Sequence, residues 1–165
     1  MNKYLIGYVT KTGTTKAVAE RIQAGLQRQA ISTELHALDQ VGDLSEYAGV
    51  IIGSPVNGMR PLPAFTEFLT SNRPALNQKI VGVFILSYIY QVGRPIWKKR
   101  IDGEVARIRL DFNPGKVAVF GARMASGLPG IFKLLFGIPK NAPSDNRDWV
   151  AIDAWTDSLA AAIKA

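Results

Sequence analysis

Lys3-Tyr-Leu-Ile-Gly-Tyr-Val9 leads directly into Thr10-Lys-Thr-Gly-Thr-Thr15, and this junction is the most informative part of the 165-residue sequence. The apolar run over residues 3–9, ended by small polar residues, predicts a buried β-strand. Val18, Ile22 and Leu26 then recur every fourth residue, which is typical of an amphipathic helix. A strand that passes through a turn rich in threonine and glycine into a helix indicates a layered α/β fold.

The same alternation continues to the end of the chain. Helical patterns begin near Pro61 and Pro63, extend from about Pro95 to Arg109, and close the sequence, while apolar segments predict further strands at 33–37, 49–54, 80–87 and 116–120. Five strands separated by helices imply a parallel sheet that is wound on both faces, because crossover connections are right-handed. No linker or repeat interrupts the pattern, so we expect a single domain over residues 1–165.

Composition narrows the function classes. The absence of cysteine excludes thiol catalysis and cysteine-ligated metals, and a single histidine, His36, argues against a histidine-based metal or triad site. We identify no catalytic residue pair and no metal site. A net charge of +7 is compatible with phosphate-bearing ligands and anionic membranes as partners. The sequence lacks a nucleic-acid-binding signature, so we expect no nucleic-acid partner. We expect a cytoplasmic protein, at most peripheral to the inner face of the membrane, because no apolar stretch is long enough to span a bilayer.

Residues 10–15 are the leading candidate for a ligand site. In doubly wound sheets, ligands bind beyond the carboxyl ends of the strands. Hydroxyl groups, a glycine and a helix N-terminus together suit a phosphate. The spacing fits neither the Walker A loop nor the dinucleotide fingerprint, since Thr14 stands where a lysine is required and no Gly-x-Gly-x-x-Gly follows the strand. An ordinary capped helix start is the alternative.

The pattern Thr-x-Thr-Gly-x-Thr after the first strand resembles the FMN-phosphate loop of flavodoxins, and the resemblance covers nearly the whole chain. It implies a flavodoxin-like doubly wound five-stranded parallel sheet of order 2-1-3-4-5, with FMN as cofactor. It implies that the phosphate is held by Thr10, Lys11, Thr12, Gly13, Thr14 and Thr15. The flavin ring would be flanked by Ser54, Pro55, Val56, Asn57 and Gly58 and by Ser87, Tyr88, Ile89 and Tyr90, with either tyrosine as a stacking surface.

The segment 121–148 is an unusually long connection between the fifth strand and the last helix. Its place and its apolar, basic character resemble the menaquinone-dependent protoporphyrinogen oxidase type of flavodoxin-like protein. Ile131, Leu134, Leu135 and Ile138 fall at helical spacing. This segment is either a lid on its own domain or a surface for a partner, a quinone or an anionic membrane through residues 126–140. The excess of basic residues over 94–123 would attract anionic groups or form only a solvated face.

Three hypotheses follow for function. The first is an FMN-dependent oxidoreductase, for which the resemblance suggests protoporphyrinogen as substrate and a redox partner or quinone-type acceptor. The second is a flavodoxin that carries electrons between proteins; the basic charge argues against it because such carriers are typically acidic. The third is a flavodoxin-fold binding module without FMN.

Overall fold

Five parallel strands form the centre of the molecule in the computed structural model, which describes residues 2–124 and 128–165. The strands are β1 (Lys3–Tyr8), β2 (Ser32–Ala37), β3 (Gly49–Asn57), β5 (Ile80–Leu86) and β6 (Lys116–Phe120). Their order is β2-β1-β3-β5-β6, which confirms the predicted doubly wound arrangement. The sheet gains one short strand that was not predicted, β4 (Arg60–Pro61), which pairs antiparallel with the end of β3.

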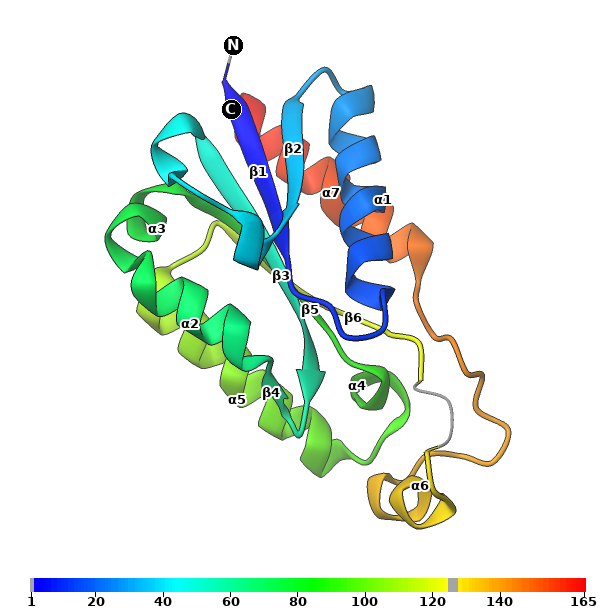
Figure 1. Ribbon diagram of the computed structural model, residues 1–165. Coiled ribbons are helices and arrows are strands. Elements are labelled where there is room, and N and C mark those ends of the chain that lie inside the picture. Colours follow the sequence, from blue (N-terminus) through cyan, green and yellow to red (C-terminus); the bar gives the residue numbers. More distant parts are fainter. Residues whose placement is uncertain (1, 125–127) are drawn as a thin grey trace.

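Helices cover both faces of this sheet (Figure 1). Helices α1 (Thr14–Arg28) and α7 (Trp149–Lys164) pack on one face. Helices α2 (Pro63–Ser71), α3 (Arg73–Lys79) and α5 (Pro95–Phe112) pack on the other. The neighbours Leu5 and Ile6 are both fully buried, each in the core of a different face. A strand covered on both sides reads as a continuous apolar run for this reason.

The remaining elements are short and lie in the connections between the strands and helices. Two 3₁₀ turns, η1 (Leu38–Gln40) and η2 (Leu44–Glu46), connect β2 to β3. Helix α4 (Tyr88–Val92) follows β5 at once, and α6 (Gly130–Phe136) lies within the predicted insert. Figure 1 shows α4 and α6 at the end of the sheet opposite the two chain termini. Within the described residues, no helix combines the length and the apolar character needed to span a bilayer.

Candidate functional site

A cavity of about 270 Å³ lies at the carboxyl edge of the sheet, where the three loops predicted to bind a ligand meet. The predicted residues that line it are Lys11, Thr12, Thr14, Pro55, Val56, Asn57, Gly58, Ser87, Tyr88 and Ile89. The predicted residues that do not line it are Thr10, Gly13, Thr15, Ser54 and Tyr90. The structure therefore brings all three loops to one site but not every residue of each loop.

The loop over residues 10–15 leaves the first N–H groups of α1 without a side-chain cap. Gly13 adopts a φ of 86°, a left-handed conformation that favours glycine, and its N–H donates to Thr10 Oγ1 over 3.0 Å. The hydroxyl oxygens of Thr12 and Thr14 lie 3.2 Å apart. No side chain caps α1, and its first turn carries no acidic residue. Helix N–H groups without a cap attract an anion.

Thr15 adds an independent sign that this loop binds a ligand. Its side chain is fully buried, and its Oγ1 has no hydrogen-bond partner among the described residues. An unpaired buried hydroxyl costs free energy, so native proteins keep few of them. Thr15 does not itself line the cavity but directly follows Thr14, which does, and we predict that a phosphate held by this loop is the partner of that hydroxyl.

The second loop is a tight hairpin between β3 and β4. Gly58 and Met59, the two residues at its tip, both have positive φ angles, of 59° and 66°, as in a type I′ turn. Ser54 is fully buried and closes the base of the hairpin, since its Oγ accepts from the N–H of Leu62 over 3.1 Å. Ser54 thus has a clear structural role, and the cavity wall is formed by Pro55 to Gly58 instead.

The third loop separates the two tyrosines proposed for stacking. Ser87 caps α4, because its Oγ accepts from the N–H of Tyr90 over 3.1 Å. Tyr88 lines the cavity, and its hydroxyl donates to the carbonyl of Pro143. Tyr90 points to α5, where its hydroxyl donates to Asp102 Oδ1 over 2.7 Å and Lys98 lies over its ring. Burial and this carboxylate raise the pKa of Tyr90 to about 12.

A fourth wall of the cavity comes from the segment after β6, which was predicted as a possible lid but contributed none of the predicted ligand-binding residues. Its lining residues are Ala122, Arg123, Met124, Leu128, Phe136 and Ile138, joined by Met59 and Leu62 from the hairpin. Residues 125–127 of the predicted insert, including the start of the segment 126–140, lie outside the described residues. The helical spacing noted in this segment was a usable signal, but it did not show which side chains face inward.

Asn146 holds this fourth wall against the rest of the site. Its Nδ2 donates to the carbonyl of Tyr88 over 3.0 Å, and its Oδ1 accepts from the N–H of Ala122 over 2.8 Å. One side chain thus ties the end of β6 to α4. Nothing in the sequence distinguishes Asn146 from an ordinary loop asparagine, and it was not predicted to belong to the site.

The charged side chains that line the cavity are all basic. Lys11 and Arg123 line it, and no aspartate or glutamate is among its lining residues. The described part of the chain contains no cluster of three or more His, Asp or Glu side chains that could hold a metal ion. The lining is otherwise largely apolar, so the site suits a ligand that combines an apolar body with an anionic group.

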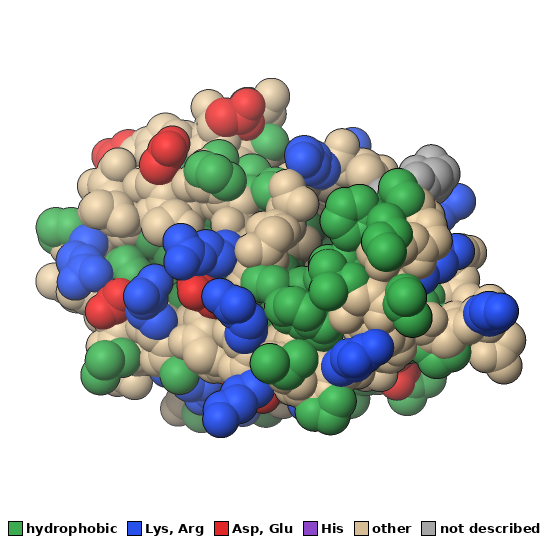
Figure 2. All heavy atoms as spheres, turned by 90° about the horizontal axis from the view of Figure 1, so that it is seen from below, with side chains coloured by type: hydrophobic (Ala, Val, Ile, Leu, Met, Phe, Trp, Pro, Cys, Tyr) green, Lys and Arg blue, Asp and Glu red, His purple; other side chains and the backbone are tan. Residues whose placement is uncertain are grey.

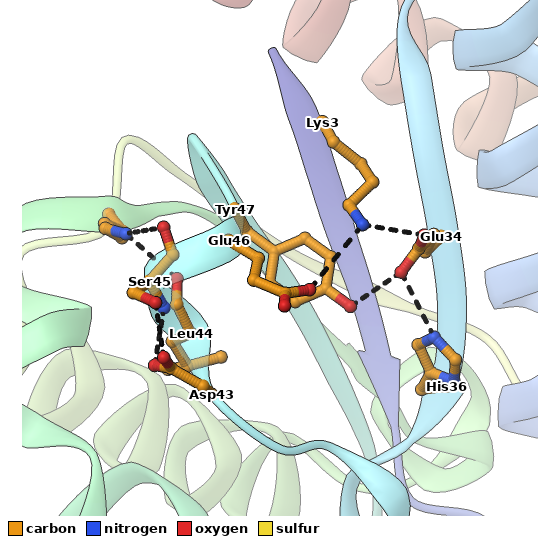
Figure 3. Close-up of polar contacts among 9 residues, drawn as sticks. Lys3, Glu34, His36, Asp43, Leu44, Ser45, Glu46 and Tyr47 are labelled. Carbon is orange, nitrogen blue, oxygen red and sulfur yellow. Dashed lines mark hydrogen bonds and ion pairs between the residues drawn. The ribbon is translucent and has the colours of Figure 1, made fainter.

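The main cluster of titratable groups lies away from the cavity, on β1 and β2 and near η2 (Figure 3). Glu34 accepts from Lys3 Nζ over 2.8 Å and from the hydroxyl of Tyr47 over 2.7 Å. These donors hold the pKa of Glu34 at about 2. His36 Nε2 lies 3.5 Å from the same carboxylate. These contacts join the sheet to the turn that precedes β3, and none of the four residues lines the cavity.

Comparison with solved structures supports the fold assignment. The chain is similar to the rubredoxin oxygen:oxidoreductase of Desulfovibrio gigas (TM-score 0.66, 17% identity), with 99% of this chain and 36% of that one covered. An archaeal flavodoxin aligns with a TM-score of 0.61 and 17% identity, over 99% of each chain. A flavodoxin of Fusobacterium nucleatum, whose structure holds flavin mononucleotide, aligns with a TM-score of 0.55 and 16% identity, over 99% of this chain and 98% of that one.

Sequence comparison identifies the family. A search among curated proteins returned no significant match. The family model described as flavodoxin domain matches residues 5–124, which include most of β1, the threonine loop and all the other strands of the sheet. This match covers well over half of the sequence, and the chain therefore belongs to the flavodoxin domain family.

Proposed function

We propose that this chain is a cytoplasmic FMN-dependent oxidoreductase, with the cofactor in the cavity at the carboxyl edge of the sheet. The observation that carries this proposal is the start of α1, which has no side-chain cap and where the buried Thr15 hydroxyl has no partner among the described residues. The Fusobacterium nucleatum flavodoxin structure with bound flavin mononucleotide shares the fold and supports the choice of ligand. FMN, when bound, supplies the redox chemistry, while the protein supplies binding and orientation.

The three loops and the segment after β6, which form the four walls of the cavity, would each contact a different part of the ligands. Lys11 and the hydroxyls of Thr12, Thr14 and Thr15 would hold the phosphate, with the first amides of α1. Pro55 to Gly58 and Ser87 to Ile89 would flank the ring, and Tyr88 is the aromatic residue placed to contact it. The cavity of about 270 Å³ is slightly smaller than typical ligand sites, so one edge of a flavin would stay open to a second reactant.

The fourth wall favours an apolar, anionic organic substrate. Leu128, Phe136 and Ile138 give this wall an apolar surface, and Arg123 adds a cation within reach of a carboxylate. These properties fit protoporphyrinogen, which combines a large ring with propionate groups, and a quinone-type electron acceptor. They also match the position and character that the protoporphyrinogen oxidase resemblance implies.

An electron carrier between redox proteins is the second candidate. Its support is membership of the flavodoxin domain family and a fold shared with an archaeal flavodoxin of similar length. The net charge of +7 opposes the docking of acidic carriers on basic reductases. A binding module without FMN is less favoured, because the threonine loop leads into an uncapped helix start that suits a phosphate.

Turnover with a quinone separates these functions. The purified chain, loaded with FMN, is mixed with protoporphyrinogen and a water-soluble quinone, and formation of the oxidised porphyrin is followed by its fluorescence. Enzyme function predicts many turnovers per chain, with a raised KM in Arg123→Gln. Lys116→Gln, on the far end of β6, is the control and should behave as the unaltered protein. Reduction and reoxidation by redox proteins alone, without organic turnover, would identify a carrier.

A further inference from the structure

Helix α6 exposes an apolar surface that the proposed function does not use. Ile131, Phe132, Leu134 and Leu135 are 69%, 44%, 67% and 52% exposed. Ile96, at the start of α5, is 61% exposed. Among the described residues, five of the eight large apolar side chains that are exposed therefore belong to α6 and the start of α5. Such a concentration marks an interaction surface.

These two segments form one surface. The N–H of Arg94 donates to the carbonyl of Phe136 over 2.9 Å, and Trp97 Nε1 donates to the carbonyl of Leu135 over 3.3 Å. The rings of Trp97 and Phe136 also pack edge to face, with centroids 5.4 Å apart. Ile96 lies between Arg94 and Trp97 in sequence, so this stretch of backbone is held close to α6.

The surface is strongly basic at its border. Residues 94–100 and 128–140 contain six cations and no carboxylate: Arg94, Lys98, Lys99, Arg100, Lys133 and Lys140. Among the described residues, none of these six forms an ion pair with a carboxylate. Figure 2 shows hydrophobic side chains gathered on this side of the molecule, with Lys and Arg side chains around them.

We propose that α6 and the start of α5 dock on an anionic lipid surface. At 3.6 residues per turn, the four exposed side chains of α6 spread over an arc of about 160°. A convex, wholly apolar arc bordered by unpaired cations matches the interface of an anionic bilayer, where apolar side chains enter the acyl boundary and cations meet headgroups. A second copy of this chain is a poor occupant, because an isologous contact would bring two uncompensated basic surfaces together.

Docking in this way would also place the cavity next to the bilayer. Phe136 and Ile138 line the cavity, whereas Ile131 and Leu134 of the same segment face solvent. An apolar reactant dissolved in the membrane would therefore approach the fourth wall directly. This consequence rests on the proposed function, whereas binding to the lipid surface does not, so the two can fail separately.

Vesicle co-sedimentation of the full chain, with and without added FMN, tests the proposal. The probe is large unilamellar vesicles of three parts phosphatidylcholine to one part phosphatidylglycerol, compared with phosphatidylcholine alone. We expect binding to the anionic vesicles that weakens with added salt, with little binding to the neutral ones. Equal binding to both, or none to either, would overturn the proposal whatever the FMN result.

Two pairs of variants locate the surface. Ile131→Ser with Leu134→Ser should lower the vesicle partition coefficient at least about tenfold, because two exposed side chains can no longer enter the interface. Leu110→Ser with Val150→Ser is the matched control: these side chains are 85% and 80% exposed elsewhere, and binding should be retained. Both pairs alter exposed residues, and a common thermal unfolding midpoint confirms that they fold. Equal losses in both pairs would refute the assignment.

Charge neutralisation gives a second readout. Lys133→Gln with Lys140→Gln should weaken binding about 25-fold, at about fivefold for each cation near the headgroups. Arg28→Gln with Lys164→Gln removes the same charge from the ends of α1 and α7 and should change binding less than about twofold. Sedimentation velocity without lipid completes the experiment. A dimer that dissociates in the Ile131→Ser, Leu134→Ser variant would assign the surface to a second copy and contradict lipid docking.

Discussion

Replacing Thr15 by valine should have opposite effects on the stability of the free protein and on its affinity for FMN. Valine keeps the shape of threonine and exchanges the hydroxyl for a methyl group. The Thr15 hydroxyl is buried without a partner, and such a group costs about 1–3 kcal/mol. Thr15→Val should therefore raise the free energy of unfolding of the FMN-free protein by about 1 kcal/mol.

The same substitution removes a hydrogen bond to the phosphate in the proposed complex. A hydrogen bond to a charged group contributes about 1.5–3 kcal/mol, which corresponds to a dissociation constant about 10- to 150-fold higher. Urea unfolding measures the stability, and fluorescence titration measures the affinity. Most substitutions that weaken ligand binding by damaging the fold lower both the stability and the affinity. A rise in stability together with a loss of FMN affinity would therefore identify a direct contact.

Thr33→Val is the matched control. Thr33 is also buried, with an Oγ1 that has no partner among the described residues, but it lies near the start of β2, paired with Tyr4 and away from the loop over residues 10–15. Its substitution should leave stability unchanged or higher and should not alter FMN affinity. If Thr15→Val binds FMN as tightly as the unaltered chain, or if Thr33→Val weakens binding as much, the assignment of Thr15 to the phosphate is refuted.

Two further predictions concern stability. A Cβ on Gly53 would lie 2.1 Å from the buried ring of Phe84, so Gly53→Ala should lower the free energy of unfolding by about 1–3 kcal/mol. Gly103→Ala, in an open position of α5, should raise it by up to about 1 kcal/mol. Equal urea unfolding midpoints for the two variants would contradict the close packing at Gly53. The pKa of Glu34 in the folded protein is about 2, below its ordinary value of 4.5, so its contribution is complete above about pH 5 and is lost as the pH falls toward 2. The loss of unfolding free energy between pH 5 and pH 3 should therefore be smaller in Glu34→Gln, and an unchanged loss would show that the contacts with Lys3 do not stabilise the fold.

Much of the fold was predictable because the strands are covered on both faces. A run such as residues 49–54 is continuously apolar only where helices pack on both sides, and β3 is the central strand of the sheet. The two-residue strand β4 has no such pattern, because it is fixed by the turn at Gly58 and Met59. Methionine is not a residue that signals a left-handed conformation, so this hairpin was not visible in the sequence.

The site was predictable at the level of loops and less so at the level of side chains. Residues 10–15, 54–58 and 87–90 each contribute to one cavity, because parallel strands end at the same edge. The direction of Tyr90, however, depends on Asp102 and Lys98 in α5, which are distant from the loop pattern. The fourth wall depends on Asn146, whose two hydrogen bonds form only in the folded chain.

Titration of the purified chain with FMN and, in parallel, with riboflavin tests the central claim most directly. Riboflavin has the same ring but lacks the phosphate that residues 10–15 are proposed to hold. The account predicts that FMN saturates one site per chain, with shifted absorption bands and quenched fluorescence, and that riboflavin binds far more weakly. An unchanged FMN spectrum would show that the cavity does not bind the cofactor, and equal affinity for the two flavins would show that the threonine loop is not a phosphate site.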